Sequence, residues 1–141
     1  MTHRTMTPFL RNVLRIDAAL SGATALALMA DAEPLAAWTG LPAAALQGIG
    51  VALVPWVGLL AWLAGRASVP GAAIGTVIAL NFVWALDCAL AAFGIVGSPQ
   101  GLGVAVLAMQ AVGTVVLAEL EWVGLRRASA VVSPGVGAWA R

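Results

Sequence analysis

The 141-residue sequence contains no lysine, one cysteine and one histidine. Without lysine, no Schiff base to a carbonyl cofactor such as retinal can form. The single Cys88 excludes an internal disulfide and a CxxC redox pair. His3 alone cannot supply both axial ligands of a haem or a histidine-rich metal site. We expect no metal and no cofactor. Since the sequence also lacks a Ser/His/Asp set and a phosphate-binding loop, we expect no enzyme activity.

Charge is also scarce, because only 9% of the residues are charged whereas 62% are hydrophobic. A soluble domain of this length needs a far more charged surface to face water. The composition therefore predicts a single-domain integral membrane protein whose first partner is the lipid bilayer. The formal net charge of +1 gives no reason to expect a nucleic-acid partner.

Prolines divide the chain into four long apolar segments. Pro8, Pro42, Pro70 and Pro99 each stand at the start of one segment, where a missing backbone N–H has no helical partner to lose. The predicted transmembrane helices lie near 8–30, 42–65, 70–95 and 99–126. Each is long enough to cross a hydrocarbon core of about 30 Å. Residues 33–40, which end in a glycine, predict a short interfacial helix between the first two.

The basic residues all lie on one side of this pattern. They are Arg4, Arg11, Arg15, Arg66, Arg126, Arg127 and Arg141. Because the Lys/Arg bias of short loops sets orientation in a membrane, both termini are expected in the cytoplasm. The predicted fold is an all-α, up-down bundle of four transmembrane helices over residues 1–127, with a flexible cytoplasmic tail over 128–141. Ala30-Asp31-Ala32 has the small-x-small form of a signal-peptide cleavage site. Pro34, close behind it, favours a first helix that is retained and not cleaved off.

A first candidate site lies near the middle of the membrane. Asp87 lies deep in the third helix with no arginine at its depth, and carboxyls in such places are expensive and often functional. Counting back from the turn at 98–99 places Gln110 level with Asp87, which predicts an amide-to-carboxyl hydrogen bond. The residues of a possible proton or ligand site are Asp87, Gln110, Asn81, Trp84 and Trp56. The alternative is structural: Asp87 is a hydrogen-bonded carboxyl at a partner interface, the asparagine bridges helices and the two indoles pack in the core.

A second cluster of charges is expected near the cytoplasmic face. The uncharged stretch 18–30 is too short to cross the membrane alone, so Arg15 and Asp17 must be drawn below the inner interface. Glu119 and Arg126 share a helix face at i, i+7. We predict a salt network among these four residues that fixes the bundle, with a cytoplasmic gate as the alternative.

Four short motifs carry a resemblance to known proteins. They are Leu14-Arg15-x-Asp17-x-x-x-Ser21-Gly22, Gly40-Leu41-Pro42, Leu80-Asn81-x-x-Trp84 and Glu119-x-x-x-x-Gly124-Leu125-Arg126. Together they resemble small, uncharacterised four-helix proteins of the bacterial inner membrane. The resemblance extends over most of the chain and implies no reaction, substrate or cofactor.

Two classes of function follow from the sequence. The leading hypothesis is a non-enzymatic accessory or assembly subunit that binds other membrane proteins, or a second copy of itself, through stripes of small residues. The alternative is a proton-linked small transporter, or a binder of a small hydrophobic ligand, centred on Asp87. The substitution Asp87→Asn separates the two, because it keeps shape and hydrogen bonding but cannot titrate.

Overall fold

The computed structural model describes residues 3–129, which fold into four long helices, one short helix and two short strands. In chain order these are β1 (His3–Thr5), α1 (Pro8–Ala30), α2 (Ala32–Thr39), α3 (Ala43–Ala64), β2 (Ser68–Pro70), α4 (Gly71–Ala92) and α5 (Leu102–Arg127). The four long helices have 22 to 26 residues and are apolar enough to cross a membrane. The predicted helical character and the four membrane-spanning candidates are confirmed, which supports a multi-pass membrane protein.

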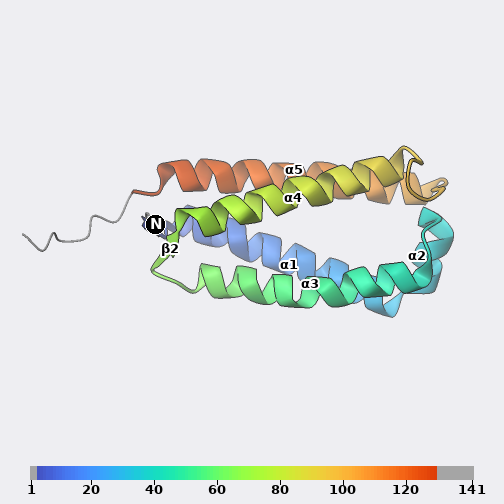
Figure 1. Cartoon of the computed structure of the whole chain (residues 1–141), viewed down its shortest axis with the longest axis horizontal. Helices are drawn as coiled ribbons and strands as arrows, with labels where there is room; N and C mark the ends of the chain where they lie inside the picture. The colour runs from blue at the N-terminus through green and yellow to red at the C-terminus, as the bar shows by residue number, and fades with distance from the viewer. Residues whose placement is uncertain (1–2, 130–141) are drawn as a thin grey trace, which may run out of the picture.

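The long helices lie side by side along the longest axis of the molecule (Figure 1). One end carries β1, β2 and the last turn of α5, and we call it the ribbon end. The other carries α2 and the loop between α4 and α5, and we call it the α2 end. Helix α1 packs along α3 and α4 packs along α5, while α1 also contacts α5. The bundle is therefore two helix pairs placed against each other.

Local sequence explains where the helices begin and end. The Thr7 hydroxyl accepts a hydrogen bond from the backbone N–H of Leu10 at 3.2 Å, and a proline follows it at the first position of α1. Helix α2 ends at Gly40, whose φ of 67° favours glycine. Helix α4 ends at Ala92 rather than near 95, because Gly94 and Gly97 then take φ values of 72° and 80°.

The apolar core occupies the half of the bundle nearer the ribbon end. It contains Met6, Leu10, Leu14, Leu60, Leu63, Ala64, Val69, Ile74, Val77, Ile78 and Ala118. Met6 lies just before α1 and the others come from α1, α3, β2, α4 and α5, and each is at most 6% exposed. The two helix pairs are thus sealed together at this end by close apolar packing.

A two-stranded antiparallel ribbon is the feature that the all-α prediction missed. Arg4 of β1 lies opposite Val69 of β2, and the N–H of Thr5 donates to the carbonyl of Ser129 at 3.0 Å. In β2, Val69 precedes Pro70, and the residue before a proline prefers an extended conformation. Ala128 and Ser129, the first residues of the predicted tail, are therefore held by the ribbon. The rest of that tail, 130–141, lies outside the described residues.

At the α2 end, α2 lies tightly against the loop between α4 and α5. The N–H of Gln100 donates to the Trp38 carbonyl at 3.2 Å. A Cβ at Gly103 would overlap that same carbonyl, and one at Gly97 would lie 2.9 Å from the Thr39 carbonyl. Glycine is needed at these positions because two backbones approach each other directly. This contact joins the two helix pairs at the end opposite the core.

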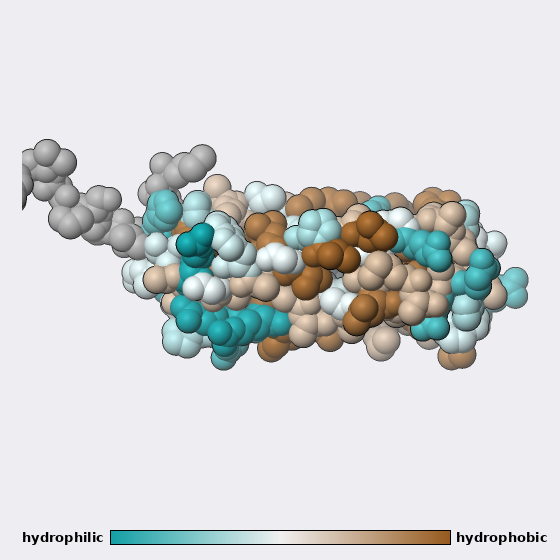
Figure 2. Space-filling view, turned by 90° about the horizontal axis from the view of Figure 1, so that it is seen from below, coloured by the Kyte–Doolittle hydropathy of each residue, from teal (hydrophilic) through white to brown (hydrophobic). Residues whose placement is uncertain are grey.

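The outer surface suits a bilayer. Apolar residues dominate its middle and hydrophilic residues gather toward both ends (Figure 2). Near the ribbon end, the Arg66 guanidinium lies 4.3 Å from the ring centroid of Trp62 and the Arg126 guanidinium 5.7 Å from that of Trp122. Cation–π pairs of this kind keep the charge at the interface while the indole faces lipid.

Candidate functional site

A cavity of about 420 Å³ lies between the two helix pairs in the half nearer the α2 end. All five helices contribute to its wall. The lining residues are Thr24, Leu28, Leu35, Thr39, Leu41, Ala45, Leu46, Ile49, Trp84, Asp87, Cys88, Ala91, Val96, Val106, Leu107 and Gln110. Most are apolar, and the polar groups are few. The cavity therefore combines the apolar walls and sparse polar positions that are typical of small-molecule sites.

Asp87 and Gln110 both line this cavity, but the predicted hydrogen bond between them does not form. The Gln110 amide Nε2 instead donates to the hydroxyl Oγ1 of Thr24 on α1 at 3.0 Å. The side chain of Asp87 is exposed on the cavity wall. Counting residues along the α4–α5 hairpin relates the depths of Asp87 and Gln110 but takes no account of α1. Helix α1 provides the acceptor that Gln110 uses, the Thr24 hydroxyl. The Asp87 carboxyl is left available to an occupant of the cavity.

A second cavity of about 300 Å³ adjoins the first on the side of the core. The two share Thr24, Trp84 and Gln110 in their walls. Beyond these residues the second cavity is lined by Ser21 and ends at Asp17. A continuous line of polar side chains therefore runs from the ligand-sized cavity to a buried carboxyl group.

The two central tryptophans have different environments. Trp84 is half-buried and lines both cavities. Trp56 is also half-buried but packs against the apolar core at the ribbon end. Of the two predicted pocket walls, the structure places Trp84 at the cavities and Trp56 in the core.

Asp17, Asn81 and Glu121 form a buried polar cluster at the inner limit of the second cavity, one residue from each of α1, α4 and α5. The Asn81 amide Nδ2 donates to Asp17 Oδ2 at 3.0 Å and to Glu121 Oε2 at 3.1 Å. The Ser21 hydroxyl donates to Asp17 Oδ1 at 3.0 Å. Asp17, Asn81 and Glu121 are 2%, 4% and 0% exposed. One amide thus holds two carboxyl groups inside the bundle.

This cluster replaces the predicted salt network, which is wrong. Arg15, Glu119 and Arg126 are exposed, whereas Asp17 points into the bundle. Residues two apart lie about 200° apart around a helix. Burying Asp17 therefore turns Arg15 outward, and burying Glu121 turns Glu119 outward.

Glu121 is the site residue that the sequence analysis passed over. It follows Thr114 and Leu117 at i+7 and i+4, and all three are buried on one face of α5. That spacing was the available signal. Glu119 and Arg126, seven residues apart, instead suggest a charge pair on another face of the helix.

The electrostatics of the cluster are unusual for a membrane interior. The two carboxyl oxygens bonded to Asn81 Nδ2 lie no more than about 6 Å apart, a limit set by the 3.0 and 3.1 Å bonds to one nitrogen. Two full negative charges at that separation repel each other by about 3 kcal/mol at an effective dielectric constant of about 20. The other oxygen of Glu121, Oε1, is buried and has no hydrogen-bond partner within residues 3–129. Burial and the neighbouring like charge both disfavour a state in which both carboxyl groups are ionised.

The residues do not suggest a metal centre. Within the described part of the chain, no group of three or more His, Cys, Asp or Glu side chains is placed to hold a metal ion. The donors around the two carboxyls are an amide N–H and a hydroxyl, which already point their hydrogens at the oxygens.

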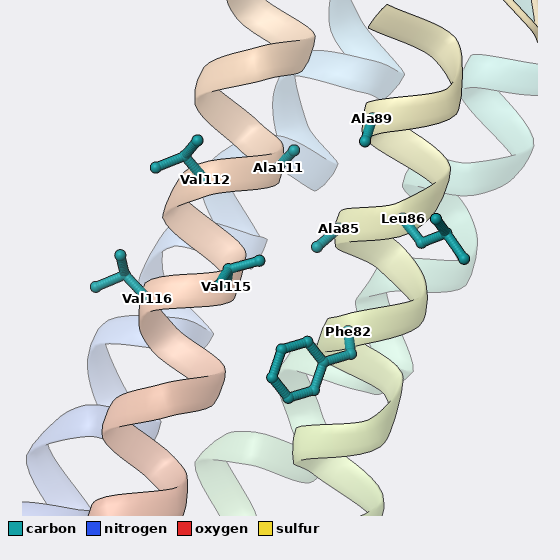
Figure 3. Close-up of a pocket in the computed structure, with 8 residues that line it drawn as sticks. All are labelled: Phe82, Ala85, Leu86, Ala89, Ala111, Val112, Val115 and Val116. Carbon is teal, nitrogen blue, oxygen red and sulfur yellow. The ribbon is translucent and has the colours of Figure 1, made fainter. Parts of the chain in front are cut away.

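A third hollow lies on the outside of the bundle, between α4 and α5 (Figure 3). Small residues, Ala85, Ala89 and Ala111, lie along its floor. Larger apolar side chains, among them Phe82 and Val115, lie between the two helices (Figure 3). No charged residue lines this groove, so its occupant in a membrane must be apolar.

Comparison with known proteins found no matching family model, no similar curated protein and no similar solved structure.

Proposed function

We propose that the protein binds a small, mainly apolar molecule with a hydrogen-bonding head group in the cavity between its helix pairs. The observation that carries this proposal is the cavity of about 420 Å³ lined by all five helices. Ligand sites in proteins commonly measure about 300–1,000 Å³ and are mostly apolar with a few directed polar groups. This makes a ligand binder, and by extension a small transporter, the function that the geometry supports best.

The location of the cavity follows from the charges at the two ends. The exposed arginines Arg66, Arg126 and Arg127 lie at the ribbon end, whereas Asp31 and Glu33 lie at the α2 end. Under the positive-inside rule the ribbon end, which carries β1 and the last turn of α5, faces the cytoplasm of a bacterial inner membrane. The cavity then occupies the outer half of the bilayer, where an apolar molecule can enter from lipid or from the outside.

The lining residues define the chemistry of the ligand. The exposed Asp87 carboxyl accepts hydrogen bonds, which favours a head group with an N–H or O–H donor and especially an amine. The indole of Trp84 offers a flat apolar face beside it. Gln110 is engaged with Thr24 and lies where the second cavity adjoins this one. A flat apolar amine suits the Asp87 carboxyl and the Trp84 indole.

Binding of 9-aminoacridine to the purified protein tests this proposal. We expect saturable quenching of tryptophan fluorescence in the wild type and at least about tenfold weaker binding in Asp87→Asn, equivalent to about 1.4 kcal/mol for one lost charge-assisted contact. The matched control is Glu119→Gln, which removes an exposed acid outside both cavities. Equal affinity in the wild type and Asp87→Asn would reject Asp87 as the head-group site.

A second candidate function is the binding of another membrane protein, as an accessory or assembly subunit. The apolar groove between α4 and α5 supports it, because its alanine floor allows a neighbouring transmembrane helix to approach closely. Copurification in mild detergent tests this role. A stoichiometric membrane-protein partner is expected, and isolation of the chain alone or only as a homodimer would count against it.

A further inference from the structure

We propose that Asp17, Asn81 and Glu121 form a proton-binding site, in which one proton is held between the two buried carboxyl groups. The site goes beyond the proposed ligand binding and does not depend on it, since it involves none of the groups proposed to contact the ligand. The proton is therefore assigned to the buried carboxyl pair and not to Asp87 on the cavity wall, the candidate suggested by the sequence.

The hydrogen bonds of the cluster leave one carboxyl oxygen without a donor. Asp17 receives a donor on each oxygen, from Ser21 and from Asn81. Glu121 receives one donor on Oε2, and its Oε1 is buried without any. A buried carboxylate oxygen without a donor is strongly unfavourable. A proton on the glutamate removes that charge and turns the carboxyl into a donor that can face the neighbouring acid.

No charged side chain among the described residues compensates the pair in place of a proton. On α1, Arg15 is exposed, and the Arg11 guanidinium donates to the Arg66 carbonyl at the ribbon end. Helix α3 contains no charged residue at all. On α4, Asp87 belongs to the wall of the outer cavity.

The remaining charges belong to the end of α5 and to the ribbon. Glu119, Arg126 and Arg127 are exposed, and both arginines lie over aromatic rings. Arg4 Nη1 donates to the carbonyl of Ala128 at 3.1 Å. The carboxyl pair is therefore enclosed by apolar side chains, one amide and one hydroxyl.

The arrangement favours a proton over a metal cation. Both hydrogens of Asn81 Nδ2 are used by the two carboxyls, and the Ser21 hydroxyl donates to one of them. A sodium ion would require oxygen lone pairs at these positions, with the asparagine amide turned round. The observed donors instead suit carboxyl groups that share a single proton.

The second cavity provides a route for that proton. From Asp17 it passes Ser21 and Thr24 and reaches Gln110, where it meets the larger cavity. Its volume of about 300 Å³ has room for several waters at about 30 Å³ each. On the other side, the closely packed core begins with Leu14 and closes the way to the ribbon end. In this conformation the site exchanges protons with the α2 end.

The proposal is tested by infrared difference spectroscopy of the full chain in lipid, in which spectra recorded at successive pH values are subtracted. The wild type should show the carbonyl band of a protonated carboxyl group that is lost in Glu121→Gln and in Asp17→Asn. The matched variant Glu119→Gln, which alters an exposed acid on the same helix, should retain it. Two variants of the pair are used so that a folding defect in one, visible by circular dichroism, leaves the other as the test.

Three results would overturn the proton site. The first is a wild-type spectrum in which the folded protein shows no protonated carboxyl. The second is an unchanged carboxyl band in a folded Glu121→Gln or Asp17→Asn protein. The third is loss of the band when sodium is added at constant pH, which would identify the cluster as a sodium site.

Discussion

Replacing Asn81 with alanine should destabilise the bundle by about 3 kcal/mol. The side chain is 4% exposed and its Nδ2 donates to carboxyl oxygens on two other helices, at 3.0 and 3.1 Å. Hydrogen bonds to charged groups contribute roughly 1.5–3 kcal/mol each in soluble proteins, whereas bonds between membrane helices average about 0.6 kcal/mol. Asp17 and Glu121 are almost fully buried, so a carboxyl oxygen that loses its donor there is costly. A value of about 1.5 kcal/mol for each of two bonds is therefore reasonable.

The assay is reversible unfolding of the detergent-solubilised protein by sodium dodecyl sulfate, followed by circular dichroism. A change of about 3 kcal/mol corresponds to a more than hundredfold change in the unfolding constant. The control is Thr76→Ala in the same helix, since Thr76 is exposed and its hydroxyl donates only to the Ala72 carbonyl one turn earlier. If Asn81→Ala unfolds within about 0.5 kcal/mol of Thr76→Ala, the amide does not hold the three helices together.

Two further predictions concern the ends of the bundle. Gly103→Ala should open the α2 end, because the added methyl would overlap the Trp38 carbonyl. The sole cysteine, Cys88, lines the cavity at that end. It should then react several-fold faster with a water-soluble maleimide. Gly75→Ala, whose added carbon would have nothing within 4 Å, should leave that rate unchanged, and equal rates in both variants would contradict closure by this contact. Alkaline phosphatase fused after Arg66 should be inactive, as expected for a cytoplasmic connection. Periplasmic activity of that fusion would reverse the proposed orientation.

Much of the secondary structure could be predicted from local sequence. A run of more than twenty apolar residues must be helical in lipid, because no water is present to satisfy its backbone groups. Pro8 and Gly40 mark helix ends through their own backbone preferences, and the structure begins α1 and ends α2 at these positions. The ribbon was missed because pairing between β1 and β2 joins segments more than sixty residues apart, and local preferences show only that each is extended.

The candidate site could be predicted only in part. Asp87, Gln110 and Trp84 were selected because polar or aromatic residues are conspicuous in an apolar helix, and the structure places all three at one cavity. The predicted partner of Gln110 was wrong because counting residues along a helical hairpin relates only helices that are consecutive in the chain. The hydrogen bond to Thr24 depends on the register between α1 and α5, the first and last long helices, which no short loop connects.

By itself the sequence determined how many segments can cross a membrane and which connections carry positive charge. It also located the starts of α1, α3 and α4 to within one residue, whereas α5 starts at Leu102, three residues after the predicted Pro99. These are local properties, set by composition, proline positions and the distribution of arginines. Only the tertiary structure decided which face each helix turns inward. In a chain whose helices are apolar on every side, hydrophobicity does not select a buried face, because lipid accepts the same side chains as the core. The rotation that buries Asp17 and Glu121 on Asn81, and exposes Arg15 and Glu119, follows from packing and hydrogen bonding among three helices.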